Sequence, residues 1–142
     1  MNRVSTLPDF SRLEVAMDQW SAPFWQAGGE HRLVMPRCTA CATFRWPPGP
    51  FCPTCRAKAV AWVPPGAARI HSFTILAQPG ADKDAPPQWR MPTLVEFADA
   101  PGVRLVSVLI DAPCDAVAIG DPVEIVWQPA ANALVPVFRL RG

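Results

Sequence analysis

Residues 38–55 read CTACATFRWPPGPFCPTC and contain two Cys-x-x-Cys pairs separated by ten residues. Two thiolates spaced in this way hold one edge of a tetrahedral metal ion, and a second pair completes the ligand set. Zn²⁺ prefers four soft ligands of this kind, so the spacing predicts a closed structural zinc site at Cys38, Cys41, Cys52 and Cys55. Iron in a rubredoxin-like site would use the same ligands. Dithiol exchange is a less natural use of two pairs at this spacing.

The residues between the two pairs are rich in aromatic side chains and proline. We expect Phe44, Trp46 and Phe51 to cover the metal, because so short a module has too few residues to bury a core of its own. The prolines among residues 47–50 stiffen the return path to the second pair.

Length and composition limit the class of protein. The chain has 142 residues, of which 50% are hydrophobic, enough for one ordinary domain or two small ones with a real core. Cys114 is left outside the two pairs, which suits a reducing compartment. The first nine residues lack the pattern of a secretory signal, and no apolar run reaches the roughly 20 residues needed to span a bilayer. We therefore expect a soluble, cytoplasmic protein.

Charge is distributed unevenly along a chain whose net charge is +1. Residues 30–70 contain six basic residues and one acid, a balance of +5, whereas residues 71–142 contain five bases and eight acids, a balance of −3. A basic module on a mildly acidic body favours an anionic ligand near the metal. Solvated arginines on a small loop-rich module explain the same pattern equally well.

The N-terminal segment has a helical pattern. Asp9 is a good helix cap, and Phe10, Leu13, Met17 and Trp20 then recur at spacings of three and four, which forms one apolar stripe. A proline at position 23 restarts the chain in a short second helix that the glycines at 28 and 29 end. We expect the stripe to pack on the protein's own barrel or on a partner subunit.

From Trp62 onward the pattern is typical of strands. We expect a strand at 33–35 before the first cysteine pair and five later strands at 70–78, 93–97, 103–110, 122–128 and 134–140. A helical turn at 114–121 separates the third and fourth of these, which is the order of an OB-fold barrel. Residues 79–92 form a long loop, of a length that is usually functional or mobile. The expected fold is mainly β, with an N-terminal helical docking segment (1–29), a rubredoxin-like zinc ribbon (30–61) and a five-stranded OB-fold barrel (62–142).

The order of motifs resembles the zinc-ribbon/OB-fold proteins associated with acyl-CoA enzymes, long catalogued as a domain of unknown function. The residues that carry the resemblance are Pro23-Phe24-Trp25, Leu33, the four cysteines, Pro47-Pro48, Trp62-Val63, Gly66, His71-Ser72-Phe73-Thr74, Gly120-Asp121-Pro122-Val123 and Pro136-Val137-Phe138. It covers the chain from about residue 18 onward.

That resemblance implies a companion protein without catalytic machinery of its own. Members of the family accompany thiolase-like enzymes, including lipid-transfer-type thiolases and steroid side-chain aldolases, or hot-dog-fold enoyl-CoA hydratases. The companion stabilises the catalytic subunit and helps to form its acyl-CoA binding channel. The resemblance therefore implies a hetero-oligomer that shares a coenzyme A thioester with its partner.

The residues themselves show no catalytic constellation. His71 lies in an expected strand, where a buried, hydrogen-bonded histidine is commoner than a general base, and Cys114 has no histidine close to it in sequence. We expect no independent catalysis.

Two kinds of anionic ligand fit the basic module. Coenzyme A carries a 3′-phosphate and a diphosphate, which arginines and lysines bind well, and a tryptophan stacks on adenine. The candidates for this role are Arg37, Arg45, Trp46, Arg56 and Lys58. The alternative is single-stranded nucleic acid, which OB-folds and zinc ribbons both bind, but the net acidic barrel opposes a long phosphate track.

Overall fold

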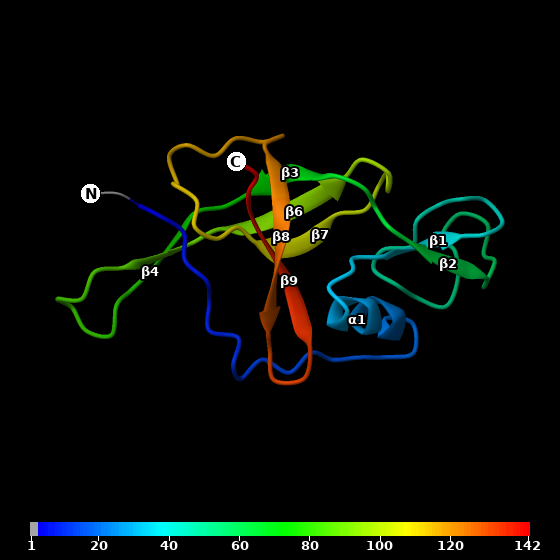
Figure 1. Cartoon of the computed structure of the whole chain (residues 1–142), viewed down its shortest axis with the longest axis horizontal. Helices are drawn as coiled ribbons and strands as arrows, with labels where there is room; N and C mark the ends of the chain where they lie inside the picture. Colours follow the sequence, from blue (N-terminus) through cyan, green and yellow to red (C-terminus); the bar gives the residue numbers. More distant parts are fainter. Residues whose placement is uncertain (1–2) are drawn as a thin grey trace.

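Five antiparallel strands form a curved sheet at the centre of the molecule (Figure 1), and the computed structural model describes residues 3–142. The strands are β3 (Ala68–Phe73), β6 (Pro92–Phe97), β7 (Leu105–Val108), β8 (Pro122–Pro129) and β9 (Leu134–Leu140), in the order β7-β6-β3-β8-β9. The two edges meet at a parallel bridge between Leu109 and Phe138, beside which the Ile110 N–H donates to the Phe138 carbonyl at 2.8 Å. This is the OB-fold arrangement, so the expected mainly β fold class is confirmed.

Alternate side chains of the strands fill the interior of the sheet. Along β6, half-buried and buried residues alternate strictly, because successive side chains of a strand point to opposite faces. Ile70, Val95 and Leu109 are fully buried in this core. The rings of Phe97 and Phe138 pack there with their centroids 6.5 Å apart.

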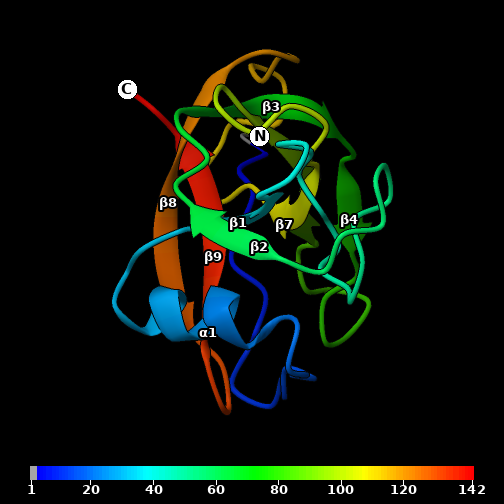
Figure 2. The ribbon, with the colours of Figure 1, turned by 90° about the vertical axis from the view of Figure 1, so that its right-hand side faces the viewer.

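A small ribbon and one helix cover one end of the sheet (Figure 2). The ribbon consists of β1 (Met35–Cys38) and β2 (Val60–Val63), which pair antiparallel so that Cys38 lies opposite Val60. The helix α1 (Ala22–Gly29) packs against β9. A side chain at Gly28 would come within 3.1 Å of the Trp127 ring, so the glycine permits the helix to approach the sheet closely.

The strand expected at residues 70–78 is in fact two elements. The pairing of β3 with β6 shifts at a bulge between Ile70 and Ser72, and the strand ends at Phe73. The chain then leaves the barrel as β4 (Leu76–Gln78), which pairs with β5 (Gln88–Arg90). We call this hairpin, residues 76–90, the arm; it projects from the molecule at the end opposite to the ribbon (Figure 1). The predicted loop at 79–92 was therefore wrong in part, since β5 lies within it.

The N-terminal helix is present as α1, but the helix predicted over residues 10–20 was wrong. Residues 3–20, which we call the strap, follow an irregular path past the arm and then past the tip of the β8–β9 hairpin (Figure 1). Residues 3–6 bond to the backbone of residues 111–114 and of Trp89. The Leu13 carbonyl accepts the Ala131 N–H at 2.9 Å, and both backbone groups of Val15 bond to the side chain of Asn132. Because these backbone groups bond to the hairpin and not to one another, the residues of the apolar stripe do not form a helix.

Two further local expectations differ from the structure. Residues 114–121 form reverse turns and contain no helix, with the Asp121 carboxylate accepting the Ala118 N–H at 2.9 Å. His71 is only partly buried on the outer face of the sheet, where its Nδ1 lies 3.9 Å from the Glu96 carboxylate.

Candidate metal centre and adjoining surfaces

The four cysteines lie on two loops that have the same backbone hydrogen bonds. In the first loop the Ala42 N–H donates to the Cys38 carbonyl at 2.9 Å, and in the second the Arg56 N–H donates to the Cys52 carbonyl at 3.0 Å. Ala42 and Arg56 both follow the second cysteine of their pair, and both have positive φ, 66° and 65°. Such a turn directs both thiols of a pair to the same side.

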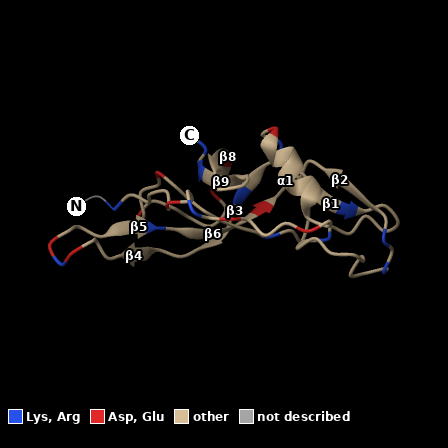
Figure 3. Cartoon of the chain, turned by 90° about the horizontal axis from the view of Figure 1, so that it is seen from below, with Lys and Arg blue, Asp and Glu red and all other residues tan. Residues whose placement is uncertain are grey.

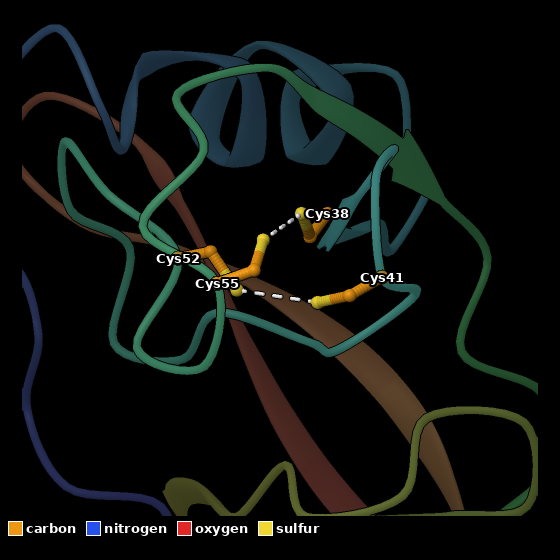
Figure 4. A group of neighbouring side chains, drawn as sticks. All are labelled: Cys38, Cys41, Cys52 and Cys55. Carbon is orange, nitrogen blue, oxygen red and sulfur yellow. Dashed lines mark hydrogen bonds between the residues drawn. The ribbon is translucent and has the colours of Figure 1, made fainter.

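The sulfur atoms converge on one point between the loops (Figure 4). All four lie within 4.8 Å of one another, with 3.5 Å between Cys38 Sγ and Cys55 Sγ and 3.5 Å between Cys41 Sγ and Cys52 Sγ. A tetrahedral zinc ion with Zn–S bonds of about 2.3 Å separates its sulfurs by about 3.8 Å. The four thiols therefore have the number, type and spacing that such an ion requires.

Backbone N–H groups aimed at the sulfurs favour thiolates. The Cys41 N–H lowers the pKa of the Cys38 thiol, and the N–H groups of Cys55 and Thr54 lower the pKa of Cys52 to about 6. The Ala57 N–H acts on Cys55 in the same sense, but the adjacent Cys38 thiol and desolvation outweigh it and raise the pKa of Cys55 to about 11. Without a metal the cluster thus keeps protons that a bound cation would displace.

Among the five residues expected to bind coenzyme A, three are exposed on the ribbon: Arg37, Arg56 and Lys58. Arg45 is buried, with 4% of its surface exposed, and its guanidinium donates to backbone carbonyls of the second loop. Trp46 is half-buried, and its ring lies 5.1 Å from that of Phe24 in α1. Figure 3 shows Lys and Arg spread along the ribbon, whereas the tip of the arm carries both signs of charge.

A depression of about 470 Å³, which we call the ribbon hollow, lies beside the metal centre. Its walls include the aromatic residues Trp20, Phe51 and Trp62, and its basic groups are Arg45 and Lys58. The Lys58 ammonium lies 5.6 Å from the centre of the Phe51 ring. None of the described residues that line the hollow is acidic, so it suits an anion with a flat or apolar portion.

A second depression, the junction groove, lies where the strap, α1, the ribbon and the sheet meet. Its volume is about 390 Å³, and its walls include Trp25, Trp46, Leu105, Val106 and Pro136. Val106 is 75% exposed, which is unusual for a large apolar side chain in a strand. The strap borders both depressions, because its residue 18 lines the junction groove and its residue 20 lines the ribbon hollow.

The strap itself presents apolar side chains to solvent. Leu13, Met17 and Trp20 are 43%, 45% and 40% exposed, and they belong to the stripe predicted from the sequence. The periodic pattern indicated the correct residues for an apolar surface, although these do not form a helix. No helix of the described residues is long and apolar enough to cross a membrane.

Comparison with protein families finds two consecutive matches. Residues 25–61 match the family described as ChsH2, rubredoxin-like zinc ribbon domain, and residues 62–128 match the family described as ChsH2, C-terminal OB-fold domain.

Solved structures show the same fold. The chain resembles one titled "Ltp2-ChsH2(DUF35) aldolase" with 32% sequence identity and a TM-score of 0.74, covering 89% of this chain and 98% of that one. It also resembles a DUF35 family protein of unknown function from Sulfolobus solfataricus, with 16% identity and a TM-score of 0.63, over 88% and 87% of the two chains.

Two curated relatives differ in length. A "DUF35 domain-containing scaffold protein" of Methanothermobacter thermautotrophicus is 31% identical over 69% of this chain and 73% of its own length. A "Probable enoyl-CoA hydratase alpha subunit" of Thermomonospora curvata is 34% identical over 93% of this chain, but the chain spans only 41% of that protein.

Proposed function

The chain belongs to the DUF35 family, and on that premise we propose that it is a non-catalytic companion subunit of an acyl-CoA enzyme, either thiolase-like or hydratase-like. The family expected from the sequence motifs is confirmed. In the proposed complex this chain stabilises the catalytic subunit and completes its acyl-CoA channel.

The names of the relatives carry the proposal. One solved relative is part of an aldolase whose title names Ltp2 beside ChsH2(DUF35), a second relative is named a scaffold, and a third is named a hydratase subunit. In the last case the part that matches this chain is less than half of the protein. A module that accompanies other catalytic parts is consistent with all three names.

We assign the metal centre a structural role, with Zn²⁺ as its ion. Support comes from the matching zinc-ribbon family and from the fit of the four thiols to a tetrahedral ion. All four positions of the ion would be filled by protein sulfur, which leaves none for a substrate or a catalytic water.

We assign two surfaces to the partner enzyme. One is the strap, and the other is residues 79–92, which include most of the arm and the start of β6. Exposed Leu13 and Met17 give the strap the apolar character of an interface core. Because strap residues line both the ribbon hollow and the junction groove, a partner docked on the strap would lie against both depressions.

Within that complex we assign the phosphate-bearing end of coenzyme A to the ribbon hollow and its rim. Lys58 offers a mobile ammonium beside aromatic rings, and Arg37 and Arg56 add exposed positive charge on the same ribbon. A volume of about 470 Å³ is within the usual range for small-molecule sites. Trp46 remains a candidate for stacking, from the side of the junction groove.

Co-expression with the neighbouring open reading frames and with candidate thiolase-like and hydratase-like enzymes, followed by affinity purification, tests the partner. We expect one of these enzymes to co-purify at a fixed stoichiometry. Met17→Asp should abolish the complex, whereas the control Ile119→Asp, at an even more exposed apolar residue of the 111–121 segment, should not. Separate elution of every folded candidate enzyme would refute the proposal.

Titration calorimetry of the purified complex with coenzyme A tests the hollow. Lys58→Ala should weaken binding by about tenfold, in keeping with about 1.5 kcal/mol for one charge-assisted hydrogen bond. The control is Arg139→Ala, at an exposed basic residue of β9 outside the ribbon and the proposed partner surface, which should leave the affinity unchanged. A gel-shift with single-stranded oligonucleotides at low salt should show no complex; tight binding there would favour the nucleic-acid alternative.

A further inference from the structure

Arg45 is a buried cation without an acidic partner. Its backbone N–H donates to the Pro36 carbonyl at 2.8 Å, which ties it to β1, and 4% of its surface is exposed. Among residues 3–142 no carboxylate lies within 4.0 Å of its guanidinium, and its buried Nε has no hydrogen-bond partner. A charge held in this way is costly unless an opposite charge compensates it.

The guanidinium is held by the loop that carries the second cysteine pair. Its Nη1 donates to the carbonyl of Gly49 at 3.0 Å and to that of Lys58 at 3.4 Å, and its Nη2 donates to the carbonyl of Ala57 at 2.9 Å. These three carbonyls flank Cys52 and Cys55 on both sides. Arg45 therefore connects β1, which ends at the first cysteine, to both ends of the second loop.

The Ala57 peptide links Arg45 directly to two metal ligands. Its carbonyl accepts the Arg45 Nη2 and also the Cys52 N–H, the latter at 2.8 Å. Its N–H points at the Cys55 sulfur. Ala57 thus connects the guanidinium to the backbone of Cys52 and to the thiol of Cys55.

A metal centre of four cysteines would carry charge of the opposite sign. Four thiolates around one divalent ion have a net charge of −2, which a buried guanidinium on the adjoining loop would partly offset. The other basic residues of the second loop, Arg56 and Lys58, are exposed, so water solvates their charges better than it solvates that of Arg45. Arg37, the next basic residue toward the N-terminus, is also exposed, and Arg32 before it is paired with Glu30 at 2.9 Å.

We propose that Arg45 is a positioning residue and the counter-charge of the metal centre. It holds the 49–58 loop so that Cys52 and Cys55 face the first pair, and its charge offsets part of the charge of the tetrathiolate. This role removes Arg45 from the set that contacts coenzyme A. It rests on a metal occupying the centre, but not on the proposed partner or ligand.

The test uses the full chain with Arg45→Lys, which keeps the charge, and Arg45→Gln, which keeps a donor without the charge. The control is Arg37→Gln, at an exposed arginine of the same ribbon. Zinc affinity is measured by competition with a chromophoric chelator. We expect at least a tenfold loss for Arg45→Gln, a smaller loss for Arg45→Lys, and a change of less than twofold for the control.

A second measurement separates charge from shape. With iron in place of zinc, the reduced centre carries one more negative charge than the oxidised one, so a nearby cation raises the reduction potential. Arg45→Gln should lower the potential, and Arg45→Lys should stay close to wild type. Equal reduction potentials in Arg45→Gln and Arg45→Lys would overturn the counter-charge role. Zinc affinity unchanged from wild type in both variants would overturn the positioning role. A wild-type chain that binds no metal would overturn the premise, whereas failure to bind coenzyme A or a partner would leave this proposal intact.

Discussion

The substitution Cys38→Ser removes one ligand of the metal centre and should strongly weaken zinc binding by the ribbon. The Cys38 side chain is buried, and its sulfur lies 3.5 Å from that of Cys55. Zinc-finger peptides bind their ion with about 10–16 kcal/mol at neutral pH, which is about 2.5–4 kcal/mol for each of four ligands. Losing one ligand should therefore weaken zinc binding by about 100- to 1,000-fold. That loss is a large fraction of the roughly 5–15 kcal/mol by which an ordinary domain is stable.

The chain provides a matched control in Cys114→Ser. Cys114 is also buried, but it lies in the barrel core away from the cysteine cluster. The substitution there buries a hydroxyl in place of a thiol, at a cost of about 1–3 kcal/mol. Both variants should thus melt at a lower temperature than wild type, so the melting temperature alone does not distinguish them.

The distinguishing assay is the response of the melting temperature to a chelator, read together with metal content per chain. Wild type and Cys114→Ser should each contain one zinc and lose stability when it is removed. Cys38→Ser should contain little zinc and should melt at the same temperature with or without chelator, or fail to remain soluble. A Cys38→Ser protein with a full complement of metal and the wild-type melting temperature would refute the reasoning.

Three further substitutions test parts of the fold. Ser5→Ala should lower the free energy of unfolding by about 1–3 kcal/mol in chemical denaturation, because the buried Ser5 Oγ accepts the Ala112 N–H. A loss below about 0.5 kcal/mol would contradict this. Arg69→Ala should raise the pKa of Glu96 in an NMR titration, since the hydrogen bond from Arg69 is the main cause of its lowered pKa. The stabilisation by this pair is present above the ordinary pKa of a glutamate and is lost as the pH falls through the lowered value, so wild type and variant should converge in acid. Ala42→Gly should raise the free energy of unfolding by up to about 1 kcal/mol, because glycine adopts the positive φ of this position without strain and the gain exceeds its cost in chain entropy. A lower melting temperature than wild type would show that Ala42 is not strained.

Local patterns predicted the parts of the structure that depend on neighbours in sequence. The four cysteines define their own site, because each pair needs only one turn to aim both thiols. The strand at Leu134–Leu140 also matches its prediction, since its β-branched and aromatic residues pair with β8 through a short hairpin. In both cases the signal lies in the residues of the element itself, namely the spacing of the cysteines and the composition of the strand.

The failures depend on contacts between distant segments. Nothing local distinguishes the strap from an amphipathic helix; its path is decided by Asn132 and Ala131 at the tip of the β8–β9 hairpin. The strand predicted to begin at Ile70 ends at Phe73, after a bulge between Ile70 and Ser72, and β4 pairs with β5 instead of with the sheet.

Arg45 shows the same limit at the candidate site. Its neighbours Phe44 and Trp46 and its positive charge were compatible with an exposed ligand-binding arginine. Its burial is decided by carbonyl groups 4, 12 and 13 residues away, which the folded loop brings to one place. Charge and composition therefore predicted a basic module, but they did not distinguish the buried Arg45 from the exposed cations of the same module.

The position of the metal also bears on how the proposed ligand site is built. Cys38 ends β1 and lies opposite Val60, and two residues earlier Pro36 lies opposite Trp62. Val60, Pro36 and Trp62 all line the ribbon hollow. The thiol that binds the ion and the walls of the hollow therefore belong to the same two strands, which are only four residues long each. Such short strands have little stability of their own, so the metal stabilises the surface beside it even though it leaves no position open for a substrate.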